Sequence, residues 1–239
     1  MRQVPARRPA PIGIVGSGRA ARHFIHYLGL LSIPVRTWSR RAPGTGPVEA
    51  LEGCASVVLL IPDRAIVPFA DTWPALNRTR LVHASGCLVT DVAAVAHPLM
   101  TFGCDLYDLA TYRSIPFILD AGGPPFETML PGLPNPTFAI PPDERPRYHA
   151  LCALAGNLST LLWLKLFEGL EGRFGIPASA AHPYLARVAA NLLADPGRAL
   201  TGPLVRGDAG TISQHLNALE GDPYQRVYRA FVEAYAHRP

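Results

Sequence analysis

The amino-acid sequence predicts an α/β fold in which an open parallel sheet is followed by a small all-α C-terminal domain. Strand-like and helical segments alternate over the first 141 residues, and every later segment with a clear period is helical. In addition, Ser56–Ile61 is a continuous apolar run, which is typical of a strand buried on both faces of a parallel sheet. We therefore predict two domains, residues 1–141 and residues 142–239.

The predicted sheet begins with the short apolar run Pro11–Val15. A helix is expected over Arg19–Leu31, because apolar side chains recur there at spacings of three and four residues. Pro34–Trp38 holds β-branched and aromatic residues and predicts the second strand. A second helix is expected over Arg64–Leu76. The remaining strands of this domain are predicted at Ser56–Ile61, Arg80–Ala84, Ile115–Leu119 and Thr137–Ile140.

The C-terminal domain is predicted to be helical over residues 145–169, 178–194, 211–219 and 223–236. A helical domain of this length has only a modest core by itself. Pairing with a second copy would bury more apolar surface, so we expect a homodimer that forms through these helices.

Composition places the chain among soluble globular proteins, since 49% of its 239 residues are hydrophobic and 17% are charged. Its longest clean apolar stretches, such as Ala55–Ile61, are shorter than the roughly 18–20 residues of a membrane span, so no membrane segment is expected. The cysteines form no metal-like pair, which predicts no metal site and a reduced, cytoplasmic setting; they are Cys54, Cys87, Cys104 and Cys152.

Positive charge is concentrated at the N-terminal end. Residues 1–41 contain eight arginines and no acidic residue, whereas the remaining chain has 14 basic and 18 acidic residues. A nucleic acid or a phosphate-rich cofactor would explain this asymmetry. Because no stacking aromatic residues are interleaved with these arginines, the sequence favours the cofactor and predicts no nucleic-acid partner.

The segment after the first predicted strand fits the pattern G-x-G-x-x-A of dinucleotide-binding proteins. Gly16 allows a tight turn, Gly18 lets a pyrophosphate approach the backbone, and Ala21 permits close packing of helix and sheet. The free N–H groups at the start of the following helix would face the phosphates. We therefore predict a Rossmann-like domain whose phosphate-binding loop is Gly16-Ser17-Gly18-Arg19-Ala20-Ala21.

The end of the second strand predicts which cofactor is bound. NAD-binding proteins usually carry an acidic residue about 20 positions after the first glycine, where it accepts hydrogen bonds from the ribose. Here the chain has Ser39, Arg40 and Arg41, which can bind a 2′-phosphate through charge-assisted hydrogen bonds. The sequence thus favours NADP(H), although two arginines can also simply occupy a surface loop.

These stretches resemble a group of bacterial Rossmann-like proteins of uncharacterised function that have a C-terminal helical domain and are often described as NADP oxidoreductases. The group is distantly related to pyrroline-5-carboxylate reductase, ketopantoate reductase and prephenate dehydrogenase. The resemblance implies the fold, NADP(H) and an oxidoreductase reaction, but no particular substrate. The matching stretches are Gly13–Arg41, Val58–Asp63, His83–Gly86, His97–Phe102, Tyr148–Asn157 and Leu200–Leu216.

Ligands of open α/β sheets bind beyond the carboxyl ends of the strands. We therefore expect two short segments beside the nicotinamide ribose and ring, namely Ile61-Pro62-Asp63 and Ser85-Gly86. For Asp63, a role as a turn or helix cap is an equal alternative.

Four residues are candidates for catalysis or substrate binding. His97 follows these strands and could donate or accept the proton, and prephenate dehydrogenases have a similar His-Pro-Met stretch; the alternative is a histidine that hydrogen-bonds a loop. Asn157 and Arg206 could position a substrate, with a helix–helix hydrogen bond and an Arg206–Asp208 pair as alternatives. Lys165, the only lysine, could act as an acid, although snorkelling from an apolar stripe explains it better.

His149 and Cys152 lie one helical turn apart, and core packing is the expected role of both. The leading functional hypothesis is an NADP(H)-dependent reductase of a small imine or keto substrate that carries a carboxylate. Two alternatives stay open: an oxidative enzyme of the prephenate dehydrogenase type, and a non-catalytic dimer that binds or senses NADP(H).

Overall fold

The structure is a computed structural model that describes residues 10–41 and 44–237. The basic residues Arg2, Arg7 and Arg8 of the N-terminal asymmetry lie outside the described residues. The chain divides into two compact units, Met1–Thr160 and Leu161–Pro239, each described separately below.

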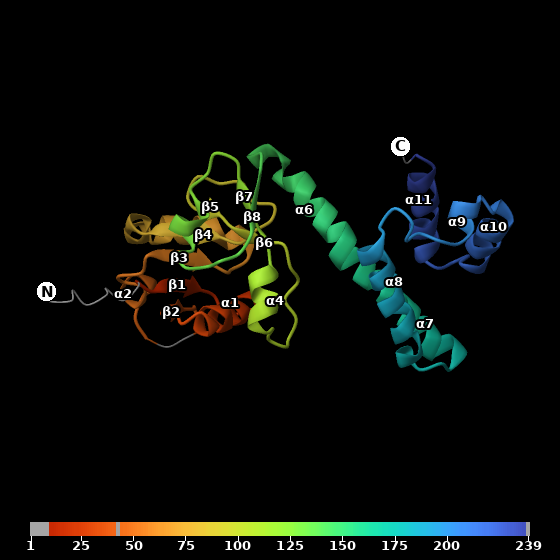
Figure 1. Cartoon of the computed structure of the whole chain (residues 1–239), viewed down its shortest axis with the longest axis horizontal. Helices are drawn as coiled ribbons and strands as arrows, with labels where there is room; N and C mark the ends of the chain where they lie inside the picture. Colours follow the sequence, from red (N-terminus) through yellow and green to blue (C-terminus); the bar gives the residue numbers. More distant parts are fainter. Residues whose placement is uncertain (1–9, 42–43, 238–239) are drawn as a thin grey trace, which may run out of the picture. The chain divides into compact units, whose positions relative to one another are not determined.

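The first unit contains a five-stranded parallel sheet with the order β2-β1-β3-β4-β5 (Figure 1). After β1, the chain adds β2 on one side and then crosses to the other side of β1 to form β3. The switch point therefore lies between β1 and β3, where ligands of such sheets bind. The strands are β1 (Ile12–Val15), β2 (Val35–Trp38), β3 (Ser56–Leu59), β4 (Arg80–His83) and β5 (Ala94–Val95).

A second, three-stranded sheet follows in the same unit. Its strand β6 (His97–Pro98) runs antiparallel to β7 (Phe117–Asp120), which pairs in parallel with β8 (Thr137–Ile140). The strands predicted near β7 and β8 are confirmed, whereas β5 and β6 have two residues each and are too short to leave a periodic pattern.

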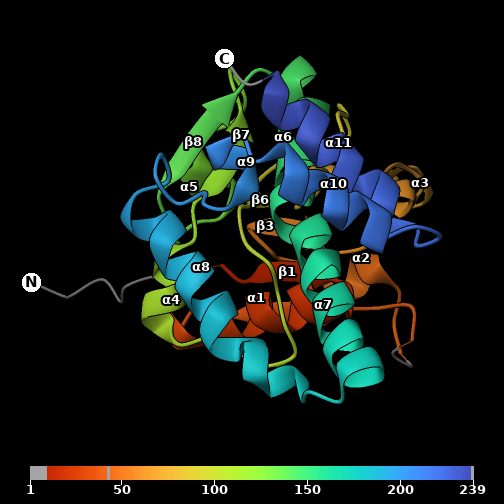
Figure 2. The same ribbon diagram turned by 90° about the vertical axis from the view of Figure 1, so that its right-hand side faces the viewer.

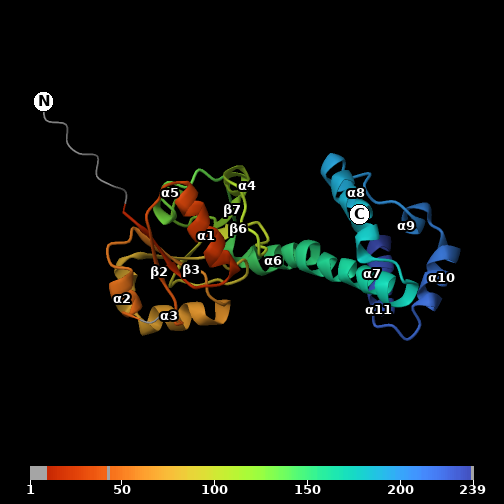
Figure 3. The ribbon, with the colours of Figure 1, turned by 90° about the horizontal axis from the view of Figure 1, so that it is seen from below.

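Helices cover both faces of the parallel sheet, as Figure 3 shows. Along β3 the side chains alternate: Val58 packs with the core beneath α1, and Val57 and Leu59 pack with the core on the opposite face. This double burial accounts for the continuous apolar run of that strand. The helices around the sheet are α1 (Arg19–Leu30), α2 (Pro47–Ala50), α3 (Ile66–Thr72), α4 (Leu109–Ser114) and α5 (Phe126–Met129).

The helix predicted over Arg64–Leu76 is shorter in the structure. Only α3 is α-helical, and short 3-10 turns precede it at Asp63–Ala65 and follow it at Pro74–Arg78. Pro74 lacks the N–H that an α-helix would use at this position, so the helix ends before it.

The C-terminal part of the first unit is helical. It comprises α6 (Arg145–Ala153) and the π-helical turn η4 (Leu154–Leu158), which continues into α7 (Ser159–Phe174). Sequence analysis predicted the domain boundary at residue 141, whereas the compact units divide after Thr160. The difference arises because Arg145 is completely buried and the His149 side chain contacts Gly86, which fixes α6 to the sheet domain.

The second unit consists of helices only. After α7 come α8 (His182–Ala194), α9 (Pro203–Arg206), α10 (Ala209–Ala218) and α11 (Tyr224–Ala236), which Figure 2 shows. Asp208 caps α10, because its carboxylate accepts hydrogen bonds from the backbone N–H and the hydroxyl of Thr211. The fold class predicted from the sequence is confirmed in both units.

One continuous helix, Pro142–Phe174, is long and apolar enough to cross a membrane by length and composition, with a mean hydropathy of 1.5 in its most apolar window. None of that window is buried within the chain. The sequence-based expectation that no segment spans a membrane stays a prediction. It considered only uninterrupted apolar runs, and polar residues such as Asn157 and Lys165 interrupt this helix.

Candidate functional site

The turn after β1 requires glycine at its first position. Gly16 has a φ of +131°, and a Cβ there would lie 2.3 Å from the carbonyl oxygen of Leu60. Its N–H donates to the Trp38 carbonyl at 2.9 Å, so the ends of β1, β2 and β3 meet at this residue. The tight turn predicted for Gly16 thus forms at the switch point of the sheet.

Gly18 serves a different purpose. It precedes α1 with ordinary extended angles, and a Cβ added there would meet nothing within 4 Å. The space beside Gly18 is thus open, whereas the Ala21 side chain is completely buried against the sheet. The first N–H groups of α1 are therefore accessible to an anionic ligand, which is the arrangement a pyrophosphate needs.

The residues predicted to bind a 2′-phosphate follow β2 directly. Ser39 is half-buried, and Arg40 and Arg41 are exposed. Within the described ranges, neither arginine forms an ion pair with a carboxylate. Their guanidinium groups are thus free to bind an anion.

The ends of β3 and β4 are joined by side chains. The Ser85 hydroxyl donates to the Asp63 carboxylate at 2.6 Å, and it accepts hydrogen bonds from the backbone N–H groups of Cys87 and Leu88. The predicted segments Ile61-Pro62-Asp63 and Ser85-Gly86 thus lie next to each other, and Asp63 holds the turn after β4 in place.

A cleft of about 910 Å³ opens in the first unit beside the start of α1. Of the described residues on its walls, Arg19 alone has a permanently charged side chain, and none is acidic. Such a cleft suits an anionic ligand. The residues that line it are Gly18, Arg19, Ala20, His97, Leu99, Met100, Thr101, Phe102, Tyr148, His149, Leu151, Cys152, Ala153, Ala155, Gly156 and Asn157.

A buried polar network fixes the cleft wall that follows His97. The His23 imidazole, which is buried under α1, contacts the Gly103 carbonyl through Nε2 at 3.1 Å and the Tyr112 hydroxyl through Nδ1 at 2.8 Å. These contacts join α1 to Gly103 at the end of the cleft wall and to Tyr112 of α4.

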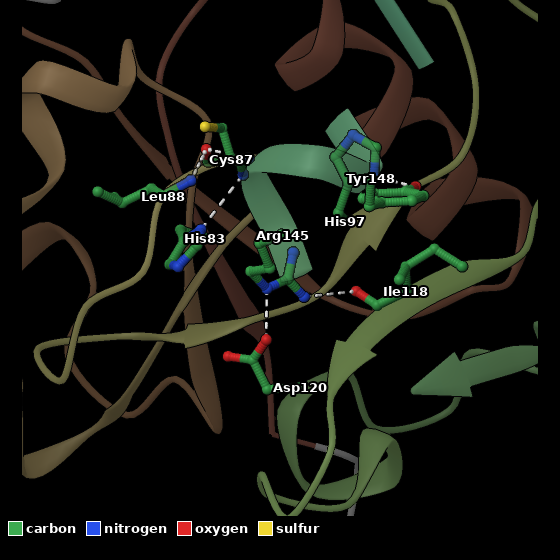
Figure 4. A network of polar contacts seen from close by, with 9 residues as sticks. His83, Cys87, Leu88, His97, Ile118, Asp120, Arg145 and Tyr148 are labelled. Atoms are coloured by element: carbon green, nitrogen blue, oxygen red, sulfur yellow. Dashed lines mark hydrogen bonds and ion pairs between the residues drawn. The ribbon is translucent and has the colours of Figure 1, made fainter. Parts of the chain in front are cut away.

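His97 and Tyr148 form the polar centre of the cleft (Figure 4). His97 Nδ1 lies 2.9 Å from the Tyr148 hydroxyl, and the His97 and His149 ring centroids are 5.7 Å apart. A Cβ at Gly86 would lie 2.3 Å from His149 Nδ1 and 2.9 Å from His97 Nε2. Glycine at position 86 therefore lets both imidazoles pack against the end of β4.

Burial and neighbouring cations set the protonation state of the site. Burial, followed by His149 and Arg145, lowers the pKa of His97 to about 4. Burial also raises the pKa of the Tyr148 phenol, and the neighbouring Cys152 thiol raises it further. Near neutral pH both groups are uncharged.

Arg145 lies behind this cluster and is completely buried (Figure 4). Its Nε donates to the Asp120 carboxylate, and Nη2 donates to the Ile118 carbonyl at 3.3 Å. Because a buried cation is stable only when it is paired, Asp120 anchors α6 to β7. Burial and the Arg145 charge also lower the pKa of His83 to about 4.

The structure brings two of the four candidate catalytic residues, His97 and Asn157, to the same cleft. The other two belong to the second unit. There Lys165 donates to Asp222 and lies 5.1 Å from the centre of the Tyr224 ring, and Arg206 is exposed.

Sequence reasoning missed several residues of the cleft. His149 packs against Gly86 and the His97 ring, in line with the expected packing role, and both His149 and Cys152 also line the cleft. Tyr148 was not predicted as a site residue and belongs only to the matching stretch Tyr148–Asn157. Their spacing in the sequence is the signal that could have identified them. Cys152 follows Tyr148 by four residues and His149 by three, so in a helix its side chain lies next to both.

Residues 121–235 match a family described as a domain of unknown function (DUF2520). No protein of curated function matches the chain in sequence with significance.

The structure is similar to several solved structures. A proposed NADP oxidoreductase from Bacteroides fragilis has a TM-score of 0.75 at 20% identity, over 97% of this chain and 99% of that chain. The protein TM1727 from Thermotoga maritima has a TM-score of 0.63 at 22% identity, over 94% and 96% of the two chains. A Plasmodium falciparum pyrroline carboxylate reductase with NADP bound has a TM-score of 0.58 at 10% identity, over 96% and 97%.

Proposed function

We propose that the protein is an NADP(H)-dependent oxidoreductase that reduces a small imine or keto substrate bearing a carboxylate. One observation carries this proposal: the open start of α1 at Gly18 and the His97–Tyr148 pair lie on the walls of one cleft. A dinucleotide phosphate and a proton-handling group are thereby placed together, as a nicotinamide-dependent reaction requires.

The cofactor would supply the hydride, and the residues of this chain would bind and orient the reactants. The N–H groups at the start of α1 and the Arg19 side chain would bind the pyrophosphate. Ser39, Arg40 and Arg41 would bind the 2′-phosphate. His97 and Asn157 would contact the substrate, because both face the cleft.

The fold similarities are consistent with this proposal, because NADP-linked proteins occur among the similar structures. The same cleft would also serve a reaction in the oxidative direction, as in prephenate dehydrogenase, or the binding of NADP(H) without turnover. Both alternatives require the same cofactor site, so cofactor binding is tested first.

The test is a fluorescence titration of the full chain with NADPH and NADH. We expect the wild type to bind NADPH more tightly than NADH, and Arg40→Ala/Arg41→Ala to weaken NADPH binding about 10-fold or more with little effect on NADH. The matched control is Arg78→Ala/Arg80→Ala, which removes the same charge at the start of β4, the opposite end of the strand from the cleft.

If neither nucleotide binds at sub-millimolar concentration, the oxidoreductase proposal is wrong. If the control pair weakens NADPH as much as the first pair, the arginines act through net charge and not through contact with the 2′-phosphate.

We further propose that the protein is a cytoplasmic homodimer that pairs through its C-terminal helices and binds no nucleic acid or membrane. The support is the row of exposed apolar side chains on these helices, which a second copy would cover.

A further inference from the structure

Tyr148 and His97 come from different elements, α6 and β6, and make a specific contact. Besides the 2.9 Å contact between the Tyr148 hydroxyl and His97 Nδ1, the two rings meet edge to face, with an interplanar angle of 83° and centroids 5.5 Å apart. The contact holds the His97 ring in one orientation and leaves only the position of its proton to be assigned.

The donor of this hydrogen bond is the tyrosine. A neutral imidazole has one donor and one acceptor nitrogen, and its acceptor nitrogen is a stronger base than a phenol oxygen. Besides contacting His97 Nδ1, the Tyr148 hydroxyl hydrogen-bonds the Cys152 side chain, which also raises the pKa of the phenol. If Nδ1 carried the proton instead, the phenol would have only the weakly accepting thiol of Cys152 beside it.

The remaining nitrogen of His97, Nε2, lies beside the end of β4, where a Cβ at Gly86 would be 2.9 Å from it. Nε2 makes no hydrogen bond within the described ranges, and it is not among the buried polar atoms that lack a partner. His97 itself lines the cleft. With Nδ1 accepting from Tyr148, Nε2 carries a proton and is a donor toward a bound ligand.

The groups around His97 keep this ring neutral. His149, Arg145 and His83 disfavour an imidazolium, and together with burial they outweigh Asp63, the carboxylate that favours it. A neutral imidazole held in this way can polarise a carbonyl group by donating a hydrogen bond to its oxygen.

We propose that Tyr148 is a positioning residue that holds His97 in the neutral Nε2–H tautomer, and that the cleft therefore takes a substrate with a carbonyl oxygen rather than a protonated imine. This inference rests on the proposed function. A carbonyl oxygen has lone pairs that accept from Nε2–H, whereas the nitrogen of a protonated imine has none.

The proton balance of such a reduction is complete with groups of this cleft and water. Bound NADPH would supply the hydride to the carbonyl carbon, and His97 Nε2 would give its proton to the oxygen as the alcohol forms. The Tyr148 hydroxyl gives its proton to Nδ1, and the phenolate regains a proton from water in the cleft. The net reaction consumes one hydride and one proton and forms an alcohol.

The test is nuclear magnetic resonance of the full chain labelled with ¹⁵N-histidine and saturated with NADP⁺ near neutral pH. We expect the His97 signals, assigned with His97→Gln, to show a protonated Nε2 and an unprotonated Nδ1. In Tyr148→Phe this preference should be lost, with a mixture of both tautomers.

The matched control is Tyr228→Phe, because Tyr228 and His215 make the same contact at 2.9 Å between hydroxyl and Nδ1 on exposed helices of the second unit. This variant should change the His215 signals and leave those of His97 as in the wild type.

A wild-type His97 with its proton on Nδ1, or an imidazolium near neutral pH, would overturn the proposal, as would a Tyr148→Phe spectrum identical to that of the wild type. The wild-type spectrum decides even if the variant does not fold. In a panel with NADPH, reduction of 2-oxo acids supports the carbonyl assignment, and reduction of cyclic imines alone overturns it.

These outcomes are separable from the proposed function. Failure of the proposed function appears as absent NADPH binding in the titration, whatever the tautomer. Failure of the present inference appears as the wrong tautomer in a protein that still binds NADPH.

Discussion

His83 and His97 show how the surroundings of single residues determine the chemistry of the cleft. His83 ends β4, and its Nδ1 accepts from the Ser85 N–H at 3.2 Å, while His97 Nδ1 contacts Tyr148. In both cases burial is the largest cause of the lowered pKa. The two imidazoles are therefore neutral where a free histidine would already be partly charged.

Acid should weaken the fold through these two residues. Each has a pKa of about 4 in the folded chain and 6.5 in the unfolded chain, so between these values the unfolded chain binds more protons. The free energy of unfolding should be constant above about pH 6.5 and fall toward pH 4, by up to about 3 kcal/mol for each histidine. Urea unfolding at a series of pH values measures this slope.

His83→Gln and His97→Gln should each reduce the difference in unfolding free energy between neutral and acidic pH, even if they lower the stability at neutral pH. A slope that is unchanged in both variants would show that other groups cause the acid sensitivity.

Among the elements, the turn before α1 contains two glycines, Gly16 and Gly18, that have different roles. Gly16 is needed for folding, because its φ is positive and Leu60 lies where a side chain would be. Gly18 is not needed for folding, because its angles are ordinary and the space beside it is open. The motif in the sequence predicts both glycines but cannot separate these roles.

Gly16→Ala and Gly18→Ala should consequently differ. Gly16→Ala should lower the free energy of unfolding by about 2 kcal/mol or more, because it combines backbone strain with a steric overlap. Gly18→Ala should cost less than about 1 kcal/mol, yet weaken NADPH binding about 10-fold or more by blocking the approach of the pyrophosphate. Urea unfolding and NADPH titration of both variants check this.

If Gly18→Ala binds NADPH as tightly as the wild type, the pyrophosphate does not lie at the start of α1. If Gly16→Ala is as stable as the wild type, the turn can rearrange without loss of the fold.

At the scale of the molecule, leucines of the first unit form an apolar seam over α6 and η4. Leu151, Leu154 and Leu158 recur at spacings of three and four residues and are 60%, 55% and 45% exposed. This spacing is typical of a helix that packs against another helix. A second copy of the chain would cover the seam, in agreement with the proposed homodimer.

Sedimentation at micromolar protein concentration should show a dimer without detergent. Leu154→Glu/Leu158→Glu places charges in the seam and should give a folded monomer, because burying unpaired carboxylates is costly. The control Leu30→Glu alters a leucine of similar exposure, 41%, at the end of α1 and should remain dimeric. A monomeric wild type, or a chain that is soluble only in detergent, would contradict the dimer proposal.

Local sequence patterns predict the parallel sheet, the glycine turn and the helical C-terminal part. These patterns are the apolar run of β3, the G-x-G-x-x-A motif that begins at Gly16 and the helical period after Arg145. Such patterns are written along consecutive residues, so they can be read without knowledge of the fold.

The chemistry of the cleft and the extent of the first unit depend instead on tertiary packing. His97 and Tyr148 are 51 residues apart, and their contact exists because Arg145 and Asp120 anchor α6 beside β6 and β7. The same anchoring carries the first unit past the boundary predicted at residue 141. Contacts between distant segments, burial and the resulting pKa shifts depend on how elements pack, and no local pattern encodes them.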